Sequence, residues 1–482
     1  MGIRYSRVLL VCPRFNRGRN RLAHFPLTGL GYIAEALEAA GAEVSVLDMN
    51  LGYTVKELTS RIGRFRPDII GFTAMTLGYK AFYGMVNEIK RGYPAIKIAL
   101  GGAHLSALRE KVLEDCPGID YGIFLEGDLS MCQLCQGENP EKIQGLIYRD
   151  NGKIVTNGFR NFIDDLDKIP FPKYRAFELQ KYPLRQIAIV TSRGCPYDCI
   201  YCSTDASIGK KFRARSAQSI LSEVEYWYGL GYREIMILDD NFTMIYERVK
   251  DFCALLGKNN FDGLRFNLTS GVRADRVDRE LLLAMKGAGV KYLAFGVEAA
   301  SDRVLKNIRK GEPIAVIEKS IREACEAGFI VDLFFLVGSP GETIDDLRLS
   351  FSLAKRYPVR RAMFYNLLPL PSTVLLSWLE EKKYLVRPLE DILNNTSYYK
   401  NQPCFVTPEM PLLARRSAFK QAQRVSLQVR RKFVEQGLNG PVYFKKFCSF
   451  IYTMPLVEDI VNNNRFMLLA KEKLKKTCLG RR

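Results

Sequence analysis

The sequence of 482 residues predicts an α/β fold in three parts. These are a doubly wound, Rossmann- or flavodoxin-like domain, a partial (β/α)6 barrel of the TIM type, and a mainly helical carboxyl-terminal region. Two runs of alternating apolar strands and amphipathic helices predict the first two parts, and a proline-rich stretch at residues 169–183 separates them. No strand rhythm continues beyond about residue 386. The expected boundaries are residues 1–142, 143–184 (hairpin and linker), 185–385 and 386–482.

The first domain is predicted from short apolar runs with helical segments between them. The expected strands are residues 8–11, 44–47, 69–73, 96–104 and 121–124, and the expected helices are 30–40, 55–65 and 81–91. The turn sequence Asp150-Asn151-Gly152 between two further apolar runs predicts a hairpin over residues 145–155.

The second domain repeats the alternation six times, which is too few for a complete eight-stranded barrel and fits an open one. The expected strands are 186–190, 234–238, 264–268, 292–297, 330–337 and 362–367, and the expected helices are 217–228, 247–256, 279–286, 314–327 and 344–356. Functional residues are expected in the loops that follow the carboxyl ends of the strands.

Composition places the chain among soluble globular proteins, with 47% hydrophobic and 26% charged residues. No apolar run is as long as a membrane-spanning helix, so a cytoplasmic location with reduced thiols is expected. The net charge is +19, and residues 401–482 hold 16 basic against 5 acidic side chains. This basic region, which includes Arg415, Arg416 and the run 430–432, is expected to be mainly a solvated helical face. Nucleic acid is not an expected partner, because no helix-turn-helix or zinc-finger pattern is present.

Three of the twelve cysteines, Cys195, Cys199 and Cys202, follow the first strand of the barrel with C-x3-C-x2-C spacing. A [4Fe–4S] cluster normally takes four thiolates, so three leave one iron open to another ligand. The alternative is a structural zinc or a chance cluster, although zinc sites more often show two C-x2-C pairs. A second C-x-x-C, Cys132 and Cys135, is expected to be two ordinary helical cysteines.

This run, with Tyr201 before its last cysteine, resembles the signature of radical S-adenosylmethionine (SAM) enzymes. Later segments resemble the branch of that family with a cobalamin-binding domain. They are residues 212–216, 234–243, 296–298, 335–343 and 368–373. Ser372 stands where the family usually has glycine. The resemblance covers roughly residues 7–380.

The resemblance implies that the three cysteines hold three irons while SAM chelates the fourth. An electron then cleaves SAM and leaves a 5′-deoxyadenosyl radical. Tyr201 and Asp240 are the implied catalytic residues. The implied cofactor-binding residues of the barrel are Asp239, Asp240, Asn241, Arg273, Glu298 and Gly338. The Asp239–Asp240 pair is expected to bind the methionine amine, Arg273 the methionine carboxylate, and Glu298 the amine or the ribose.

For the first domain the resemblance implies a bound cobalamin. The implied contacts lie at strand ends: Thr73, Met75, Gly101, Gly102, His104, Glu126 and Gly127. The Asp-x-His-x-x-Gly segment that some cobalamin proteins use for a lower axial histidine is missing. A histidine ligand to cobalt is therefore not expected, and His104 is expected to shape the pocket or to be structural.

The function that the resemblance implies is methylation of an unactivated carbon in a small-molecule or lipid-like substrate. Electrons would come from a donor such as flavodoxin or ferredoxin. Two alternatives remain: a cyclisation, rearrangement or oxidation without methyl transfer, and a non-catalytic cobalamin or iron–sulfur sensor. Residues 386–482 are expected to cover the substrate pocket. Within them, residues 443–452 are expected to pack as an ordinary helix, with peripheral membrane contact as the alternative.

Overall fold

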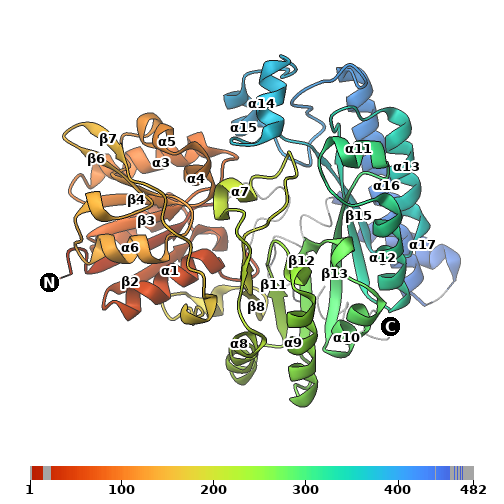
Figure 1. Ribbon diagram of the computed structural model, residues 1–482, viewed down its shortest axis with the longest axis horizontal. Coiled ribbons are helices and arrows are strands. Elements are labelled where there is room, and N and C mark those ends of the chain that lie inside the picture. Colours follow the sequence, from red (N-terminus) through yellow and green to blue (C-terminus); the bar gives the residue numbers. More distant parts are fainter. Residues whose placement is uncertain are drawn as a thin grey trace.

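The structure, a computed structural model, describes residues 3–14, 23–439 and 441–455 and the single residues 457, 461, 464, 467 and 469. The basic end of the chain, residues 470–482, lies outside the described residues. Figure 1 shows the two α/β domains side by side, with helix α7 (Thr204–Ile208) between them. The carboxyl-terminal helices lie against the barrel and above the junction.

The first domain is one seven-stranded sheet in the order β2-β1-β3-β4-β5-β6-β7. Its strands are β1 (Arg7–Cys12), β2 (Glu43–Asp48), β3 (Ile69–Thr73), β4 (Lys97–Gly101), β5 (Tyr121–Ile123), β6 (Leu146–Asp150) and β7 (Lys153–Thr156). Its helices are α1 (Thr28–Ala39), α2 (Val55–Phe65), α3 (Tyr79–Gly92), α4 (Ala103–Leu108), α5 (Glu110–Asp115) and α6 (Asp128–Cys135). The parallel part has the flavodoxin-like order, as predicted.

The predicted hairpin forms, with Asn151 and Gly152 both at positive φ, but it is not part of the connection between the domains. Strand β6 pairs antiparallel with β5 and so extends the first sheet. The turn sequence predicts a hairpin but does not show which sheet the hairpin joins, so the sequence alone groups it with the linker.

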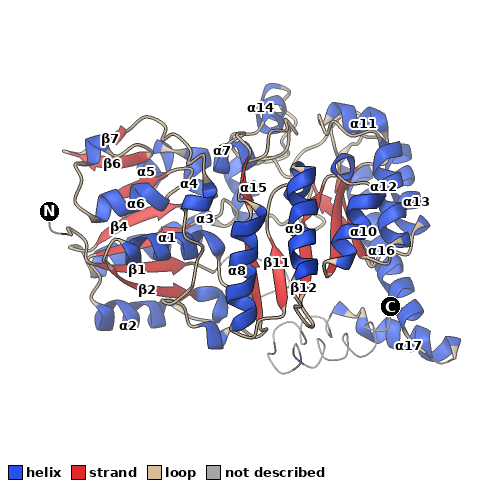
Figure 2. Cartoon of the chain, turned by 60° about the horizontal axis from the view of Figure 1, so that its bottom comes forward, coloured by secondary structure: helices blue, strands red, loops and turns tan. Residues whose placement is uncertain are grey.

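The second domain is a six-stranded, wholly parallel sheet in the order β15-β14-β13-β12-β11-β8. Its strands are β8 (Gln186–Ile189), β11 (Glu234–Ile237), β12 (Arg265–Val272), β13 (Val290–Glu298), β14 (Ile330–Val337) and β15 (Arg361–Asn366). Its helices are α8 (Ala217–Gly229), α9 (Tyr246–Lys258), α10 (Arg279–Gly287), α11 (Asp302–Asn307), α12 (Ile314–Glu326) and α13 (Ile344–Arg356). Figure 2 shows α8 and α9 covering the outside of β11 and β12. The six predicted strands of a partial barrel are confirmed.

The described part of the carboxyl-terminal region is mainly helical, as predicted, and part of it bridges the two domains. Helix α14 (Val374–Glu381) precedes the region, and the helices described within it are α15 (Leu389–Asn395), α16 (Leu412–Gly437) and α17 (Val442–Tyr452). Leu393 of α15 packs into the core of the first domain, and its carbonyl accepts a hydrogen bond from Gly78 N at 2.9 Å. Ser372, at φ 61°, donates its hydroxyl to Ala107 O of α4 at 2.6 Å.

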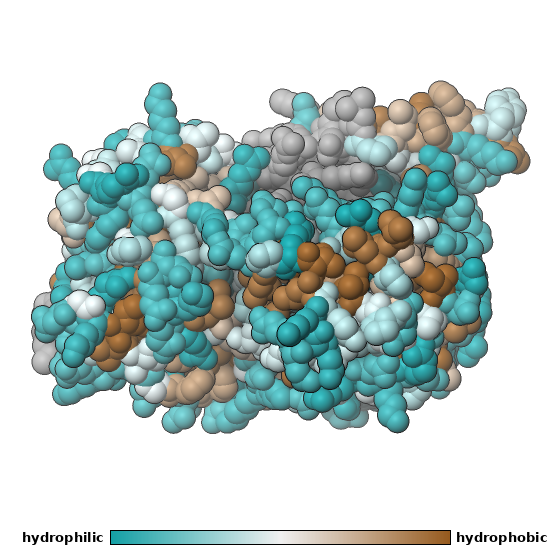
Figure 3. All heavy atoms as spheres, turned by 90° about the horizontal axis from the view of Figure 1, so that it is seen from above, coloured by the Kyte–Doolittle hydropathy of each residue, from teal (hydrophilic) through white to brown (hydrophobic). Residues whose placement is uncertain are grey.

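Helix α17 does not pack in the way the sequence predicts. Ser449 is its buried residue, and its hydroxyl donates to Glu435 of α16 at 2.7 Å. The apolar side chains of α17 are exposed instead: Val442, Tyr443, Phe444, Phe447, Phe450 and Ile451. Figure 3 shows apolar surface at the end of the molecule where α17 lies in Figure 1. No helix among the described residues is long and apolar enough to cross a membrane.

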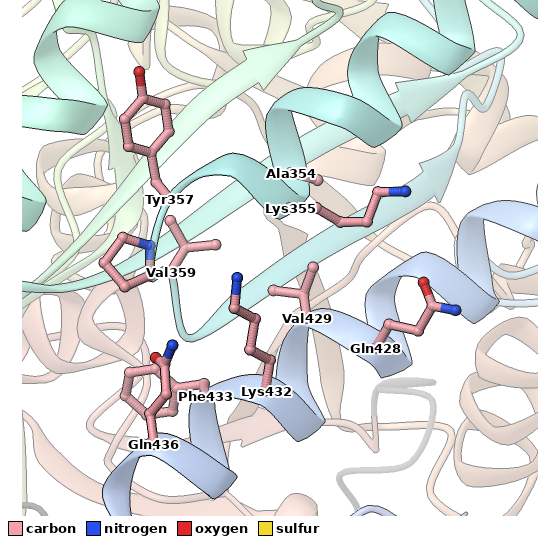
Figure 4. Close-up of a pocket in the computed structure, with 10 residues that line it drawn as sticks. Ala354, Lys355, Tyr357, Val359, Gln428, Val429, Lys432, Phe433 and Gln436 are labelled. Atoms are coloured by element: carbon pink, nitrogen blue, oxygen red, sulfur yellow. The ribbon is translucent and has the colours of Figure 1, made fainter.

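A cavity of about 170 Å³ lies between the end of α13 and helix α16 (Figure 4). It is lined by Ala354, Lys355, Tyr357, Pro358, Val359, Gln428, Val429, Lys432, Phe433 and Gln436. Its lining residues from Ala354 to Val359 directly precede β15, so the cavity lies at the amino-terminal end of that barrel strand. Active sites of such barrels lie at the opposite end, so this cavity is not the candidate active site.

Candidate active site

The cysteine-bearing loop leaves the carboxyl end of β8 and is closed at its base by a short ribbon. Strands β9 (Ser192–Arg193) and β10 (Arg213–Ala214) pair antiparallel, with Arg193 opposite Arg213. Gly194 follows at φ 87°, and a Cβ there would lie 2.2 Å from Lys211 O, so the residue must be glycine. The sequence did not predict this ribbon, because strands of two residues carry no periodicity.

Within the loop, the three cysteines are reduced and remain accessible. Cys195 and Cys199 are partly buried and Cys202 is exposed. The backbone around them is held from two sides, since Ile200 N donates to Ile308 O at 3.1 Å and Leu375 N donates to Ile200 O at 2.9 Å. Among the described residues, no three Cys, His, Asp or Glu side chains converge on one position for a single metal ion. An iron–sulfur cluster requires no such convergence, because each thiolate binds its own iron.

Two cations lie close to the thiols. Burial raises the pKa of Cys199, and Lys310 and Arg273 act against that rise. Burial also raises the pKa of Cys195, with Arg273 again opposing it. These two cations can therefore offset the negative charge that thiolates bring to the loop.

Arg273, predicted to bind the SAM carboxylate, is engaged with neighbouring protein groups. Its guanidinium bonds both carboxylate oxygens of Asp275, at 3.0 and 3.1 Å, and donates to Lys310 O at 3.0 Å. It also lies 3.5 Å over the ring of Tyr197, which belongs to the cysteine loop. Arg273 thus supports the loop, and its contact with SAM stays a prediction.

Glu298 ends β13 in a left-handed conformation, at φ 63°, which is strained for a residue with a side chain. Its carboxylate accepts a hydrogen bond from Lys310 Nζ at 3.2 Å, and Lys310 lies 3.5 Å from Glu312. Gly296 leaves room for this pair, because a Cβ there would lie 2.8 Å from Glu298 Oε1. Burial and the charge of Glu298 raise the pKa of Tyr201, so its hydroxyl keeps its proton.

Sequence reasoning did not find Lys310 and Glu312. They stand in the short charged run 309–312, and such runs usually mark solvated surface. Here both residues are buried, at 7% and 3% exposure.

The acidic pair after β11 separates into two roles. Asp239 is buried, and its carboxylate accepts hydrogen bonds from Thr191 N and Ser192 Oγ, both at 2.6 Å, and from the Thr191 hydroxyl. Both oxygens are therefore used to hold the start of the cysteine loop. Asp240 is exposed. The protein around it nevertheless excludes part of its water, and this desolvation, together with the charge of Asp239, raises the pKa of Asp240 to about 6. Asp240 is the member of the pair that can meet a ligand.

The adjacent Asn241 is buried at 1% exposure, and its amide donates to Met244 Sδ at 3.5 Å. Arg248 of α9 completes this end of β11. It donates to Thr191 O at 2.9 Å and to Phe242 O at 2.6 Å.

Gly338, predicted to contact a cofactor, lies against a buried arginine from the carboxyl-terminal region. Arg415 of α16 donates to Val337 O and Gly338 O, both at 3.1 Å, and stacks 3.9 Å over Phe405. A Cβ on Gly338 would come within 2.0 Å of the Arg415 guanidinium. The expectation that Arg415 is a solvated surface charge is wrong, because the side chain is fully buried.

In the first domain, small residues gather where β3 and β4 end. Thr73 and Gly101 are opposite each other in the sheet register. Gly102 has φ 94°, and a Cβ there would lie 2.6 Å from Thr73 Oγ1. Met75 follows on an exposed loop at 51% exposure. Small residues beside an exposed apolar side chain fit a flat macrocycle lying against strand ends.

His104 lies behind this surface rather than on it. Its Nε2 hydrogen-bonds the Tyr83 hydroxyl at 2.7 Å, and its ring stacks on Tyr79 with centroids 4.8 Å apart. Burial lowers its pKa to about 4, so the ring is neutral. The structural role that the sequence left open for His104 is the one the contacts support.

Glu126 and Gly127 follow β5 at the same edge. A Cβ on Gly127 would lie 3.4 Å from Ile33, an ordinary contact, so this glycine is not sterically required. Glu126 faces the other domain, where it binds Arg193 and Arg213.

Helix α4, which follows Gly102, packs against α7, which follows Cys202. The strand-end surface of the first domain and the cysteine loop are therefore neighbours.

Comparison with known proteins agrees with this arrangement. Residues 189–354 match the Radical SAM superfamily, and residues 21–134 match the B12 binding domain. The chain belongs to the radical SAM enzymes that carry a B12-binding domain. This membership assigns it a [4Fe–4S] cluster, SAM and cobalamin, and the three-thiol loop and the strand-end surface fit these groups.

Two relatives are similar over most of their length. An uncharacterized methyltransferase of Pyrococcus horikoshii is 29% identical over 384 residues, covering 77% of this chain and 83% of the relative. The anaerobic magnesium-protoporphyrin IX monomethyl ester cyclase of Rubrivivax gelatinosus is 26% identical, covering 78% and 70%.

Two solved structures share the fold. The radical SAM methyltransferase TsrM from Kitasatospora setae, with cobalamin and a [4Fe–4S] cluster bound, gives a TM-score of 0.70 at 18% identity, covering 88% of this chain and 89% of its own. The cobalamin-dependent SAM radical enzyme OxsB, with aqua-cobalamin and SAM bound, gives 0.73 at 16% identity, covering 98% and 75%.

The different roles of Asp239 and Asp240 are testable by two matched substitutions. Asp239→Asn should lower the free energy of unfolding by about 2–4 kcal/mol, because it leaves buried donors of Thr191 and Ser192 unpaired. Asp240→Asn, on an exposed side chain, should change it by less than about 0.5 kcal/mol. Denaturant unfolding measures both, and equal effects would contradict the assignment.

The buried neutral His104 predicts a pH dependence. Its pKa of about 4 in the folded state lies below the ordinary value of 6.5, so its contribution to stability is complete above pH 6.5 and declines as pH falls toward 4. Between pH 8 and pH 5, the free energy of unfolding should fall about 2 kcal/mol more in the natural protein than in His104→Phe. Denaturant titrations at the two pH values test this, and parallel losses would show that His104 is not the group responsible.

Proposed function

We propose that the protein methylates an unactivated carbon of a small-molecule or lipid-like substrate. When bound, the cluster supplies the electron that cleaves SAM, and cobalamin supplies the methyl group. In total, one substrate molecule, two SAM molecules and two electrons would give the methylated substrate, 5′-deoxyadenosine, methionine and S-adenosylhomocysteine. The hydrogen of the broken substrate C–H bond would end in 5′-deoxyadenosine. The electrons would come from a donor such as flavodoxin or ferredoxin.

The observation that carries the proposal is the packing of α4 against α7. It brings the strand-end surface of the first domain, with Gly102 and Met75, next to the loop with the three thiols. A methyl group can pass between two cofactors only when they lie close together, because the transfer is fast only if the reacting groups are held in the right geometry. Similarity to methyltransferases over most of the chain supports the same activity.

The protein's own residues would then orient the bound groups and neutralise charge at the thiols. Arg273 and Lys310 offset charge at the thiols, and Asp240, with a pKa of about 6, can receive an ammonium group at neutral pH. Tyr201, which keeps its proton, can donate a hydrogen bond but not act as a base. We further propose a cytoplasmic location, because Cys195, Cys199 and Cys202 must stay reduced to bind a cluster and the cytoplasm keeps thiols reduced.

The decisive experiment measures products from anaerobically reconstituted protein given SAM and a reductant. The natural protein should contain iron and form 5′-deoxyadenosine and S-adenosylhomocysteine. Cys199→Ala should form neither, because the cluster loses a ligand, whereas Cys448→Ser on α17 should behave like the natural protein.

Each rival function has its own result in this assay. 5′-Deoxyadenosine without S-adenosylhomocysteine would favour a cyclisation or oxidation, as in the cyclase relative. Iron and cobalamin without either product would favour a sensor. Zinc in place of iron would overturn the radical chemistry.

We also propose that α17 rests on an anionic membrane surface. Its polar face is turned inward, since Ser449 bonds Glu435, while Tyr443 and Phe447 are 77% and 61% exposed. Aromatic side chains favour the boundary between water and lipid. Lys445 and Lys446 on the same helix, within a region that carries 16 basic and 5 acidic residues, complement anionic headgroups.

Sedimentation with lipid vesicles tests the membrane proposal. The protein should bind vesicles that contain phosphatidylglycerol, and binding should weaken with salt and with vesicles of phosphatidylcholine alone. Phe447→Glu should reduce binding about tenfold or more, because it places a charge in the apolar face. Leu349→Glu, at a 53% exposed site on α13, is the matched control and should bind normally. If Phe447→Glu altered oligomeric state and not vesicle binding, the face would belong to a second copy of the chain.

A further inference from the structure

Both ends of the cysteine loop are tied to one carboxylate of the other domain. Arg193 and Arg213 stand opposite each other at the base of the loop, two residues before Cys195 and eleven after Cys202. Glu126 accepts hydrogen bonds from Arg193 Nη1 at 3.1 Å and from Arg213 Nη1 at 2.8 and 3.0 Å. A single side chain of the cobalamin-binding domain therefore spans the base of the loop.

The arginines are fixed by further contacts. Arg193 also bonds Asp128 at 2.9 Å and lies 4.8 Å over the ring of Tyr32, both in the first domain. Arg213 donates to Ile163 O at 3.0 Å. The side chains of Arg213 and Glu126 are 2% and 8% exposed. In such surroundings a charge that loses its partner is strongly unfavourable, so the arrangement tolerates little displacement.

The other contacts at the base of the loop lie within the barrel, where Asp239 binds Thr191 and Ser192, and Arg215 N donates to Thr191 O at 2.9 Å. The β9–β10 ribbon is two residues long on each side. Inside it, Cys195 N donates to Gly209 O at 3.3 Å, and Gly194 allows the close approach of Lys211. Because the ribbon is so short, the bridging carboxylate is the contact that both joins its two strands and sets their position against the first domain.

We propose that Glu126 is a positioning residue that fixes the cysteine loop against the cobalamin-binding domain, and not a contact to the corrin. The proposal rests on the proposed function for its catalytic consequence, since the loop and the cobalamin surface must stay in register for methyl transfer. Both carboxylate oxygens already face arginines of the barrel, which leaves the small residues after β3 and β4 to meet the cofactor.

The effect should be local, because the domains are also joined elsewhere. Leu393 packs into the first domain, Asn394 Oδ1 accepts from Lys80 N at 2.9 Å, and Ser372 bonds Ala107. These ties lie on α15 and before α14, away from the loop base. Losing Glu126 should therefore loosen the loop without separating the domains.

Hydrogen–deuterium exchange of the full-length protein, before and after cofactor loading, tests this inference. In Glu126→Gln, amides within residues 194–212 should exchange about tenfold faster or more, while the strands of both sheets are unchanged. Lys80→Met, which removes an exposed ion pair between the first domain and Glu390 of α15, should leave the loop as in the natural protein. Arg213→Lys, which keeps the charge but loses the shared geometry, should give an intermediate increase.

Unchanged exchange in the loop would overturn the proposal, and so would faster exchange spread evenly over both sheets, since that indicates a general structural role. In the loaded enzyme, Glu126→Gln should form less S-adenosylhomocysteine for each 5′-deoxyadenosine. The exchange measurement needs no turnover, so it stands even if the methyl-transfer proposal fails. Loss of product coupling with normal loop exchange would instead place Glu126 at the corrin, against the proposal.

Discussion

The cysteine loop can serve a reactive cluster only if it is exposed and yet held in place, and buried carboxylates provide the holding. Asp239 binds the backbone where the loop begins, and Glu126 binds the arginines at its base. Neither carboxylate lies in the loop itself. The thiols can therefore remain accessible while the chain on either side of them is fixed.

Buried ion pairs are a weak source of net stability, because removing two charges from water offsets much of their attraction. Their directional hydrogen bonds nevertheless define one geometry. The Glu298–Lys310–Glu312 series and the Arg273–Asp275 pair hold Lys310 and Arg273, the two cations near the thiols, in this way. These ion pairs therefore fix the positions of the two cations more than they add to net stability.

The sequence predicted most of the fold because apolar periodicity is a local property. All six barrel strands and the five parallel strands of the first sheet follow it. The cysteines and the strand-end loops were likewise visible as motifs. What could not be predicted is which polar residue pairs with which. Asp239 and Asp240 are adjacent and chemically identical, and only the fold shows that one is enclosed and the other open.

In the basic carboxyl-terminal region, too, the sequence does not show which of two adjacent charged residues is buried. Arg415 and Arg416 are neighbours, yet Arg415 is fully buried against the end of β14 while Arg416 is exposed. Burial lowers the pKa of Arg415 to about 10. Burial also raises the pKa of the nearby Glu342 carboxyl to about 8. Helix α16 thus reaches the active end of the barrel through one arginine, while α17 turns its aromatic face outward. A region whose sequence is basic throughout therefore contains both a buried arginine that binds the end of β14 and an exposed aromatic surface on α17.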